Sequence, residues 1–463
     1  MSEEILFRPD EIAAATGGPV VSGVPGKGAL GVSIDTRTIQ PGQLFVAVRG
    51  RRFDGHDFVG QALERGAVGA VVDRWPLGSF KTDPDRTIWR VPDTLTALGE
   101  LARFHRSRFP IDLVAVTGST GKSTTKTMLA HILATRELLA TPGTQNNLIG
   151  VPLTLFQLNR NHRIVVLELG TNQWGEIRRL TQIAQPSIGV ITNIGPAHLE
   201  TFGDLNGVLK AKGELWEAMD PKGRLVLNAD DPLLLEAGKR LPFSVTWFGM
   251  GRQADVRADR IILESWSCRC LVNGRWELNL PLPGRHNLMN ALAALTCAQL
   301  LGEPIPSAAE RLSTIGPLPG RLTQSSWDGC FVIDDSYNAN PSSLKAALEV
   351  LSRTDRPGRR IAVIGDMLEL GDQAAALHEE AGQWILEAGV DLLITVGPLA
   401  RHLLNGAWEA GLPKSSGWSF DAAEEAGQFL EDRVRPGDAI LVKGSREMRM
   451  ERVLRCFTTS STH

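Results

Sequence analysis

The chain has 463 residues, a length that corresponds to about three domains, and its 49 Lys and Arg residues nearly balance its 52 Asp and Glu residues. This balance excludes the basic excess of a nucleic-acid-binding protein, and no apolar run approaches the ~18 residues that span a bilayer. Five cysteines, an odd number in a long chain, argue against a disulfide framework, so a reducing, cytoplasmic compartment is expected.

The first block of the sequence, residues 1–93, is expected to form one domain. Short apolar runs at residues 44–48 and 68–72 are separated by glycine, proline and charged turns, as expected for strands. A helical pattern that includes Leu95 and Leu98 leads out of this block.

A glycine-rich loop, T-G-S-T-G-K-S-T at residues 117–124, follows an apolar run and precedes a helix-forming segment. Gly118 and Gly121 allow several backbone N–H groups to point at one anion. Lys122 supplies a positive charge for phosphates, and Ser123 supplies a hydroxyl for Mg²⁺. The loop lacks the first glycine of the usual P-loop pattern, and an ordinary strand–helix turn is the alternative. The Gly-Lys-Ser triplet between a strand and a helix favours nucleotide binding.

The second block, residues 94–316, continues with apolar runs of strand length at residues 164–169, 188–192 and 225–227. Helical segments separate these runs, which predicts a parallel sheet. A linker rich in glycine and proline, residues 315–320, ends the block.

Two residues at the ends of predicted strands are candidate metal ligands. Glu168 lies within an apolar run, where a buried carboxylate is costly unless it is paired or binds a cation. His198 lies in the loop after the next strand, and the carboxyl ends of parallel strands are where ligands bind. We favour metal ligation over the alternatives, which are an exposed strand end for Glu168 and a structural or solvated ring for His198.

Three further polar residues of this block stand on predicted helices. Lys212, taken by itself, is typical of a solvated helix lysine. Asn287 and Asn290 are three residues apart, on one face of a helix start. Their amides can contact the edge of an adenine or cap the helix.

The third block, residues 317–463, alternates strands with amphipathic helices. The pattern predicts strands at residues 331–334, 361–364, 392–396 and 439–442, and helices at residues 342–352, 373–388, 398–410 and 421–433. This order predicts a doubly wound α/β domain, and the absence of G-x-G-x-x-G after the first strand argues against a dinucleotide site.

Two loops of the third block follow strands and carry polar groups. The loop D-D-S-Y-N-A-N-P, residues 334–341, offers carboxylate, phenol and amide groups, and its Tyr337 is the only tyrosine of the chain. The loop K-G-S-R, residues 443–446, can meet an anion. The alternatives are an Asn/Pro turn with helix caps and a solvated basic helix start.

Taken in order, these segments resemble the Mur ligases, the ATP-dependent amide-bond synthetases of bacterial peptidoglycan assembly. The resemblance covers nearly the whole chain, and most of its motifs are similar to the branch that adds D-alanyl-D-alanine. The matching motifs, besides the glycine-rich loop, are S-I-D-T-R (33–37), P-G-Q-L-F-V-A (41–47), F-D-G-H-D-F (53–58), N-N-L-I-G-V-P-L-T (146–154), E-L-G-T-N (168–172), T-N-I-G-P-A-H-L-E-T-F-G (192–203), A-K-G-E (211–214), D-S-Y-N-A-N-P (335–341), G-D-M-L-E-L-G (365–371) and K-G-S (443–445).

The resemblance implies an α/β chain with a UDP-binding N-terminal domain, a central P-loop ATPase domain and a C-terminal Rossmann-like domain. It implies that the terminal carboxylate of UDP-N-acetylmuramoyl-tripeptide attacks the γ-phosphate of ATP and gives an acyl phosphate and ADP. The amine of D-alanyl-D-alanine then displaces phosphate and gives the pentapeptide precursor of peptidoglycan. ATP and two Mg²⁺ ions would be required, and we expect the enzyme to be a monomer.

The resemblance also assigns roles to individual residues. The catalytic residues would be Lys122, Lys212 and His198. The metal ligands would be Ser123, Glu168, His198 and Lys212, the last as a carbamate. ATP would contact Gly118, Ser119, Thr120, Gly121, Lys122, Ser123, Thr124, Asn287, Asn290, Arg321 and Asp335. The other substrates would contact Ser33, Thr36, Arg37, Asp54, His56, Asn146, Asn147, Tyr337, Asn338 and Ser445.

Two alternatives stay open at this point. Another amide ligase of the superfamily, similar to MurE or to folylpolyglutamate synthetase, would share the P-loop and the metal residues, although the D-S-Y-N-A-N-P segment argues against it. A nucleotide-dependent switch that binds ATP without ligation is the candidate from a different class. Dependence of ATP turnover on both an amine and a UDP-linked peptide separates these functions.

Overall fold

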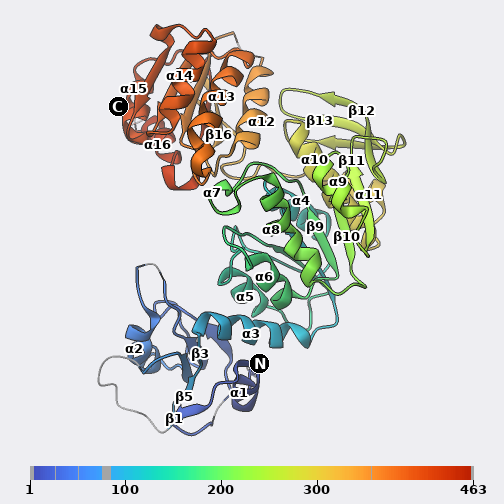
Figure 1. Cartoon of the computed structure of the whole chain (residues 1–463), viewed down its shortest axis with the longest axis vertical. Coiled ribbons are helices and arrows are strands. Elements are labelled where there is room, and N and C mark those ends of the chain that lie inside the picture. Colours follow the sequence, from blue (N-terminus) through green and yellow to red (C-terminus); the bar gives the residue numbers. More distant parts are fainter. Residues whose placement is uncertain (1–4, 27, 51, 76–84, 356, 460–463) are drawn as a thin grey trace.

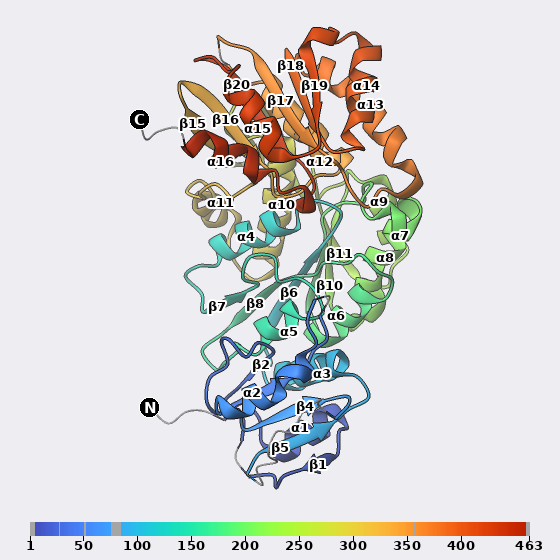
Figure 2. The same ribbon diagram turned by 90° about the vertical axis from the view of Figure 1, so that its left-hand side faces the viewer.

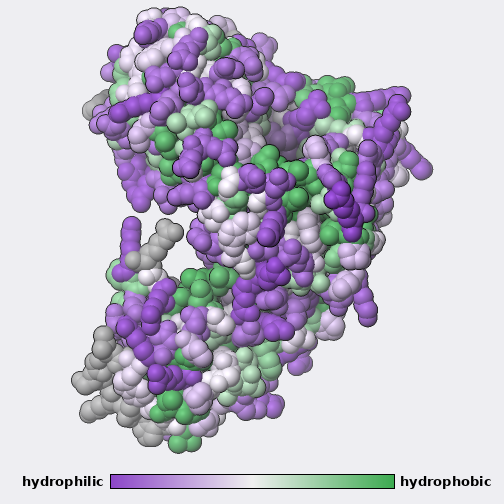
Figure 3. Space-filling view, in the orientation of Figure 1, coloured by the Kyte–Doolittle hydropathy of each residue, from purple (hydrophilic) through white to green (hydrophobic). Residues whose placement is uncertain are grey.

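The computed structural model of the chain describes residues 5–26, 28–50, 52–75, 85–355 and 357–459. Within these residues the chain forms three sheets, each covered by helices, which follow one another along the long axis of the molecule (Figure 1). Figure 3 shows a hollow on one side of the molecule, between the first domain and the third. In the described part of the chain, every helix is too short or too polar to cross a bilayer.

The first domain is built on a sheet of order β1-β5-β4-β3-β2, parallel except for β1. Its strands are β1 (Val20–Ser22), β2 (Gly31–Ser33), β3 (Gln43–Val46), β4 (Gly69–Val72) and β5 (Thr87–Arg90), and its helices are α1 (Pro9–Thr16), η1 (Gly55–Phe58) and α2 (Val59–Glu64). Helix α3 (Thr94–Ser107) leads to the second domain. Leu98 of α3 packs in the core of the first domain and Ala102 in that of the second, so α3 ties the two domains together.

The second domain contains a sheet of order β14-β13-β12-β11-β10-β9-β6-β8-β7. Its strands are β6 (Asp112–Thr117), β7 (Leu138–Ala140), β8 (Ile164–Glu168), β9 (Ile188–Ile191), β10 (Arg224–Asn228), β11 (Ser244–Gly249), β12 (Val256–Leu263), β13 (Cys268–Val272) and β14 (Trp276–Leu280). Helices α4 (Lys122–Ile132), α10 (Arg285–Leu300) and α11 (Ile305–Leu312) cover one face. Helices α5 (Gly150–Leu155), α6 (Glu176–Ala184), α8 (Leu205–Ala218) and α9 (Pro232–Gly238) cover the other (Figure 2).

The predicted parallel sheet is confirmed from β7 to β12, but the sheet continues as the antiparallel strands β13 and β14. The turn between these two strands contains Asn273 and Gly274, both with positive φ. Such residues form tight hairpin turns because their backbones tolerate the left-handed region. The Asn-Gly pair is therefore the sequence signal for this hairpin, which lies beyond the strands from which the parallel sheet was predicted.

The third domain has a sheet of order β15-β16-β20-β17-β18-β19, parallel except for β15. Its strands are β15 (Thr323–Trp327), β16 (Cys330–Asp335), β17 (Arg360–Gly365), β18 (Leu392–Val396), β19 (Gly417–Phe420) and β20 (Ala439–Lys443), and its short turns are η2 (Gly371–Gln373), η3 (Lys414–Ser416) and η4 (Arg446–Met448). Helices α12 (Pro341–Ser352), α13 (Ala374–Glu387) and α14 (Ala400–Ala410) pack on one face, and α15 (Ala423–Glu431) and α16 (Glu451–Thr459) on the other. The predicted doubly wound fold is therefore confirmed.

Candidate functional site

A cavity of about 650 Å³ lies between the second and third domains. The loops that follow β6, β8 and β9 line it from the second domain, and the loops that follow β16 and β17, with the end of β20, line it from the third. The carboxyl ends of parallel strands in two sheets therefore face one space, which is where open α/β sheets bind ligands.

The glycine-rich loop forms one wall of this cavity and requires its glycines. Gly118 has a φ of 142°, and a Cβ atom there would lie 1.9 Å from Thr192 Oγ1. Gly121 has a φ of 78°, and a Cβ atom there would lie 2.1 Å from Asn290 Oδ1. The Lys122 amine folds back and donates to the carbonyl of Gly118 at 2.8 Å, and burial lowers its pKa. Backbone N–H groups and a lysine thus gather where a phosphate chain fits.

Two further side chains support the backbone near the cavity, and neither was predicted from the sequence: Asn193 supports the glycine-rich loop, and Lys126 supports the loop that follows β7. Asn193 Oδ1 accepts from the Thr120 N–H at 3.0 Å, and its Nδ2 donates to Thr120 Oγ1 at 2.6 Å. Lys126 Nζ donates to the carbonyls of Thr141 and Gly143 at 2.9 and 2.7 Å. Lys126 follows Lys122 by one helical turn, a spacing that places both amines on the same face of α4.

The third domain reaches the glycine-rich loop through Arg321. Its Nη2 donates to Ser123 Oγ at 3.0 Å, and its guanidinium lies over the Tyr337 ring at 4.4 Å. Asp335, also at the cavity, pairs with Lys443 Nζ at 2.5 Å, and burial raises the pKa of Asp335 although Lys443 opposes the shift. Cationic and acidic groups of two domains therefore share this space.

Glu168 and His198 also line the cavity, whereas Lys212 is buried outside this lining; each of the three has one buried polar atom that lacks a hydrogen-bond partner. Glu168 is 1% exposed, and Oε1 accepts from Asn146 Nδ2 at 2.7 Å whereas Oε2 has no partner. Lys212 is 0% exposed, and burial holds the pKa of its amine well below the usual value. His198 Nδ1 lies 2.6 Å from Glu369 Oε2, without the geometry of a hydrogen bond.

The Glu168 carboxylate and the His198 ring fit a cation. Unsatisfied buried polar atoms are costly, and a cation at the cavity would give the free Oε2 of Glu168 a partner. Among the described residues no group of three His, Cys, Asp or Glu side chains is placed to hold a metal ion. Glu168 and His198 both line the cavity and are the predicted metal ligands found there together with Ser123.

The other predicted contacts in the cavity have defined neighbours. Asn287 and Asn290 are both buried lining residues, and Asn287 Nδ2 donates to the Pro283 carbonyl at 2.7 Å. Also among the lining residues are Ser119, Thr120, Thr124, Asn146, Asn147 and Asn338. Ser445 is buried outside this lining, where Oγ accepts from the Leu368 N–H at 2.9 Å and contacts the Ala339 carbonyl.

The substrate residues predicted in the first domain lie apart from this cavity. Ser33 Oγ is held within its own turn by Asp35, and Thr36 Oγ1 donates to Gln61 Oε1 at 2.6 Å. The Arg37 side chain pairs with Asp35 at 2.6 Å. Because this side chain is 85% exposed, its guanidinium is accessible to a ligand.

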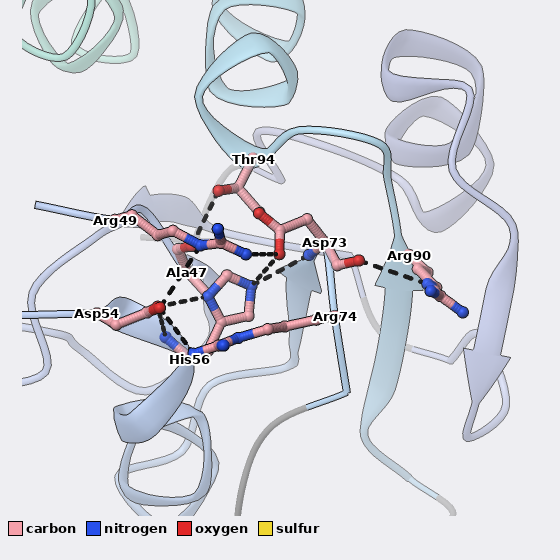
Figure 4. A network of polar contacts seen from close by, with 8 residues as sticks. All are labelled: Ala47, Arg49, Asp54, His56, Asp73, Arg74, Arg90 and Thr94. Atoms are coloured by element: carbon pink, nitrogen blue, oxygen red, sulfur yellow. Dashed lines mark hydrogen bonds and ion pairs between the residues drawn. The ribbon is translucent and has the colours of Figure 1, made fainter.

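Asp54 and His56 belong to a buried polar network in the first domain (Figure 4). His56 Nδ1 lies 2.6 Å from Asp54 Oδ1, and Nε2 accepts from the Asp73 N–H at 3.1 Å. Arg74 and Arg49 pair with these two carboxylates, each at 2.8 Å. The His56 side chain is wholly buried and both its nitrogens are engaged, so in this structure it holds the loop in place. The predicted substrate contact of His56 stays a prediction.

Family models match most of the chain. The Mur ligase family catalytic domain matches residues 30–106, the Mur ligase middle domain matches residues 116–298, and the Mur ligase glutamate ligase domain matches residues 320–446.

Relatives and solved structures match over nearly full length. The UDP-N-acetylmuramoyl-tripeptide–D-alanyl-D-alanine ligase of Escherichia coli is 37% identical and covers 93% of this chain and 94% of its own. The Bacillus subtilis ligase of the same name is 34% identical, with 92% of both chains covered. A crystal structure of MurF from Acinetobacter baumannii superposes with a TM-score of 0.88 at 32% identity, covering 97% and 98% of the two chains. MurF ligase from Thermotoga maritima in complex with ADP gives 0.81 at 31% identity, covering 92% and 96%.

Proposed function

This chain belongs to the Mur ligase family, and on that premise we propose that it joins D-alanyl-D-alanine to UDP-N-acetylmuramoyl-tripeptide with ATP. We take its domains as residues 1–93, 94–316 and 317–463, and we place the reaction in the cytoplasm. The observation that carries the proposal is one cavity in which a glycine-rich phosphate loop, a cationic third-domain arm and the buried carboxylate of Glu168 meet. The relatives that match over most of both chains carry the name of this activity.

The first step brings two anions together. An oxygen of the tripeptide's terminal carboxylate bonds to the γ-phosphorus of ATP, and the bond from that phosphorus to the bridging oxygen breaks to release ADP. Lys122 and Arg321, from two domains, are the cations placed to offset this charge. One Mg²⁺ held by Ser123 and a second held by Glu168 and His198 would polarise the phosphate oxygens.

The second step forms the amide. The neutral amine of D-alanyl-D-alanine attacks the acyl carbon, the tetrahedral adduct expels phosphate, and the amine nitrogen loses a proton. Because Tyr337, Asn338 and Asp335 stand on the third-domain side of the cavity, we assign amine positioning to that domain. The third domain must be docked for the cavity to exclude water, which would otherwise hydrolyse the acyl phosphate.

We further propose that Lys212 carries a carbamate. Its unpartnered, wholly buried amine has a lowered pKa, so the neutral form that attacks CO₂ is accessible. The nitrogen bonds to the carbon of CO₂ and releases a proton, which converts a cation into an anionic oxygen ligand. Glu168 and His198 would then have the third ligand that they lack.

A phosphate-release assay tests the function. ATP is supplied with UDP-N-acetylmuramoyl-tripeptide, with D-alanyl-D-alanine, or with both, and the products are weighed by mass spectrometry. Phosphate release is expected only with both substrates, together with a UDP-linked product heavier by one dipeptide less one water. Turnover without the amine, or with an amine but no UDP-peptide, would instead favour a nucleotide switch or another ligase.

A further inference from the structure

One turn of the second domain and one loop of the third domain dock beside the cavity. The turn, residues 198–203, holds α7 (Leu199–Phe202), and the loop, residues 367–373, ends in η2. The two elements are in contact, and Phe202 of the turn is buried in the same hydrophobic cluster as Leu370 of the loop. Apolar burial of this kind holds the two segments together.

The backbones at this junction approach closely. The Glu200 N–H donates to the Glu369 carbonyl at 3.1 Å, and Gln373 Nε2 donates to the Gly203 carbonyl at 3.1 Å. A Cβ atom at Gly371 would lie 2.9 Å from Glu200 Cα, so only glycine fits at this point. The turn at residues 198–203 and the loop at residues 367–373 are therefore closely packed against each other.

The carboxylate of Glu369 enters the site from this junction. Its Oε2 lies 2.6 Å from His198 Nδ1, and it is one of the three carboxylates whose charge acts on Lys212. Glu369 and His198 both line the cavity, and both adopt left-handed backbone conformations, with φ of 64° and 55°. Non-glycine residues keep such conformations only where the surrounding structure enforces them.

We propose that Glu369 is a positioning residue through which the docked third domain orients the His198 ring in the wall of the second domain. The inference rests on the proposed function, because it takes His198 as a ligand of that site. A carboxylate beside a ligating histidine fixes the orientation and tautomer of the ring. The wall is therefore complete only when the loop at residues 367–373 is docked, which couples domain closure to readiness of the site.

The test compares Glu369→Gln with Glu380→Gln, an exposed glutamate of α13 that serves as the matched control. Mg²⁺ is titrated calorimetrically into each full-length enzyme in the presence of ADP, and ligation kinetics are measured separately. Glu369→Gln is expected to weaken Mg²⁺ binding and to lower kcat by about 10- to 100-fold. The KM for D-alanyl-D-alanine and the Tm should match those of the control.

Gln373→Ala separates positioning from general damage to the junction. It removes the bond to Gly203 but leaves the Glu369 carboxylate in place, so Mg²⁺ affinity should stay within about threefold of the wild type. Unchanged Mg²⁺ affinity in Glu369→Gln contradicts the proposal. A loss that Gln373→Ala shares, or one that comes with a lowered Tm and raised KM for both substrates, contradicts it as well.

Failure of the proposed function would look different. The calorimetric comparison needs neither peptide substrate, so it stands even if the wild-type enzyme does not ligate D-alanyl-D-alanine. Absence of ligation by the wild type overturns the function, whereas equal Mg²⁺ affinities overturn the role of Glu369.

Discussion

Two polar regions of the molecule differ in how their buried groups are satisfied. In the first domain, the network around His56 pairs nearly all its side-chain atoms, and among its described residues Arg74 Nε is the exception (Figure 4). At the cavity and beside it, Glu168, His198 and Lys212 each leave one buried atom without a hydrogen-bond partner.

This difference distinguishes the structural network around His56 from the ligand-binding site at the cavity. An unsatisfied buried polar group costs about 1–3 kcal/mol, so the free atoms of Glu168 and Lys212 favour a ligand or a modification as their partner. A satisfied network rigidifies its loop and needs nothing further. The comparison therefore predicts loss of activity from changes in the wall and loss of stability from changes in the network.

Lys122→Ala tests the wall's phosphate loop and carries the largest expected effect. Removal of the cation that faces the phosphates should raise the barrier by about 3–4 kcal/mol or more, because no other side chain of the loop is charged. The assay is kcat by phosphate release, with Tm as the control for folding. Near-normal kcat with an unchanged Tm would show that this loop does not hold the nucleotide.

Lys212→Ala and Lys212→Arg should both be nearly inactive, since neither side chain can carry a carbamate. Short-chain carboxylates such as formate or acetate should restore part of the activity of Lys212→Ala, because they can occupy the vacated space as anions. Lys210→Ala, an exposed neighbour on α8, is the matched control. Full activity in either Lys212 variant would contradict the proposed carbamate on Lys212.

His56→Ala should act on stability instead. The change removes the partner of Asp54 and Asp73 within a buried network, and we expect the free energy of unfolding to fall by about 2–3 kcal/mol. At temperatures where the variant is folded, kcat should stay within about twofold of the wild type. Thermal unfolding of His56→Ala beside His402→Ala, an exposed histidine, measures the effect. A large fall in kcat without a fall in Tm would place His56 in the site.

Arg37→Ala is expected to give the smallest of these effects. Its exposed guanidinium should contact the nucleotide-sugar substrate, and loss of one charge-assisted contact corresponds to about a tenfold rise in KM for the UDP-tripeptide. The KM for D-alanyl-D-alanine should barely change. Arg103→Ala, an exposed arginine of α3, is the control. Equal rises in both KM values would refute the division of labour between the domains.

The sequence predicted elements well where one physical rule decides the outcome. The loop at residues 117–124 stands between a buried strand and a helix, as its glycines and flanking apolar runs require. Glu168 is buried at the end of β8, as a charged residue within an apolar run indicated. These features depend on neighbours a few residues away along the chain.

Features that depend on distant contacts were not predictable in the same way. Taken by itself, Lys212 was typical of a solvated lysine, but helix α8 packs it against the sheet and buries it completely. Glu369 reaches His198 across 171 residues of sequence, and no local pattern indicates that approach. His56 has a short-range partner in Asp54, yet its burial depends on Asp73 and Arg74 from the next strand and loop.

The most direct measurement of the central claim is a crystal structure of the enzyme with ADP and Mn²⁺ in place of Mg²⁺, read by anomalous scattering. A metal peak is expected at Glu168 and His198, with additional density on Lys212 that corresponds to a carbamate. Glu168 Oε2 should gain a ligand, while the His56 network stays as it is. A metal bound elsewhere, with Glu168, His198 and Lys212 still unpartnered, would contradict the account.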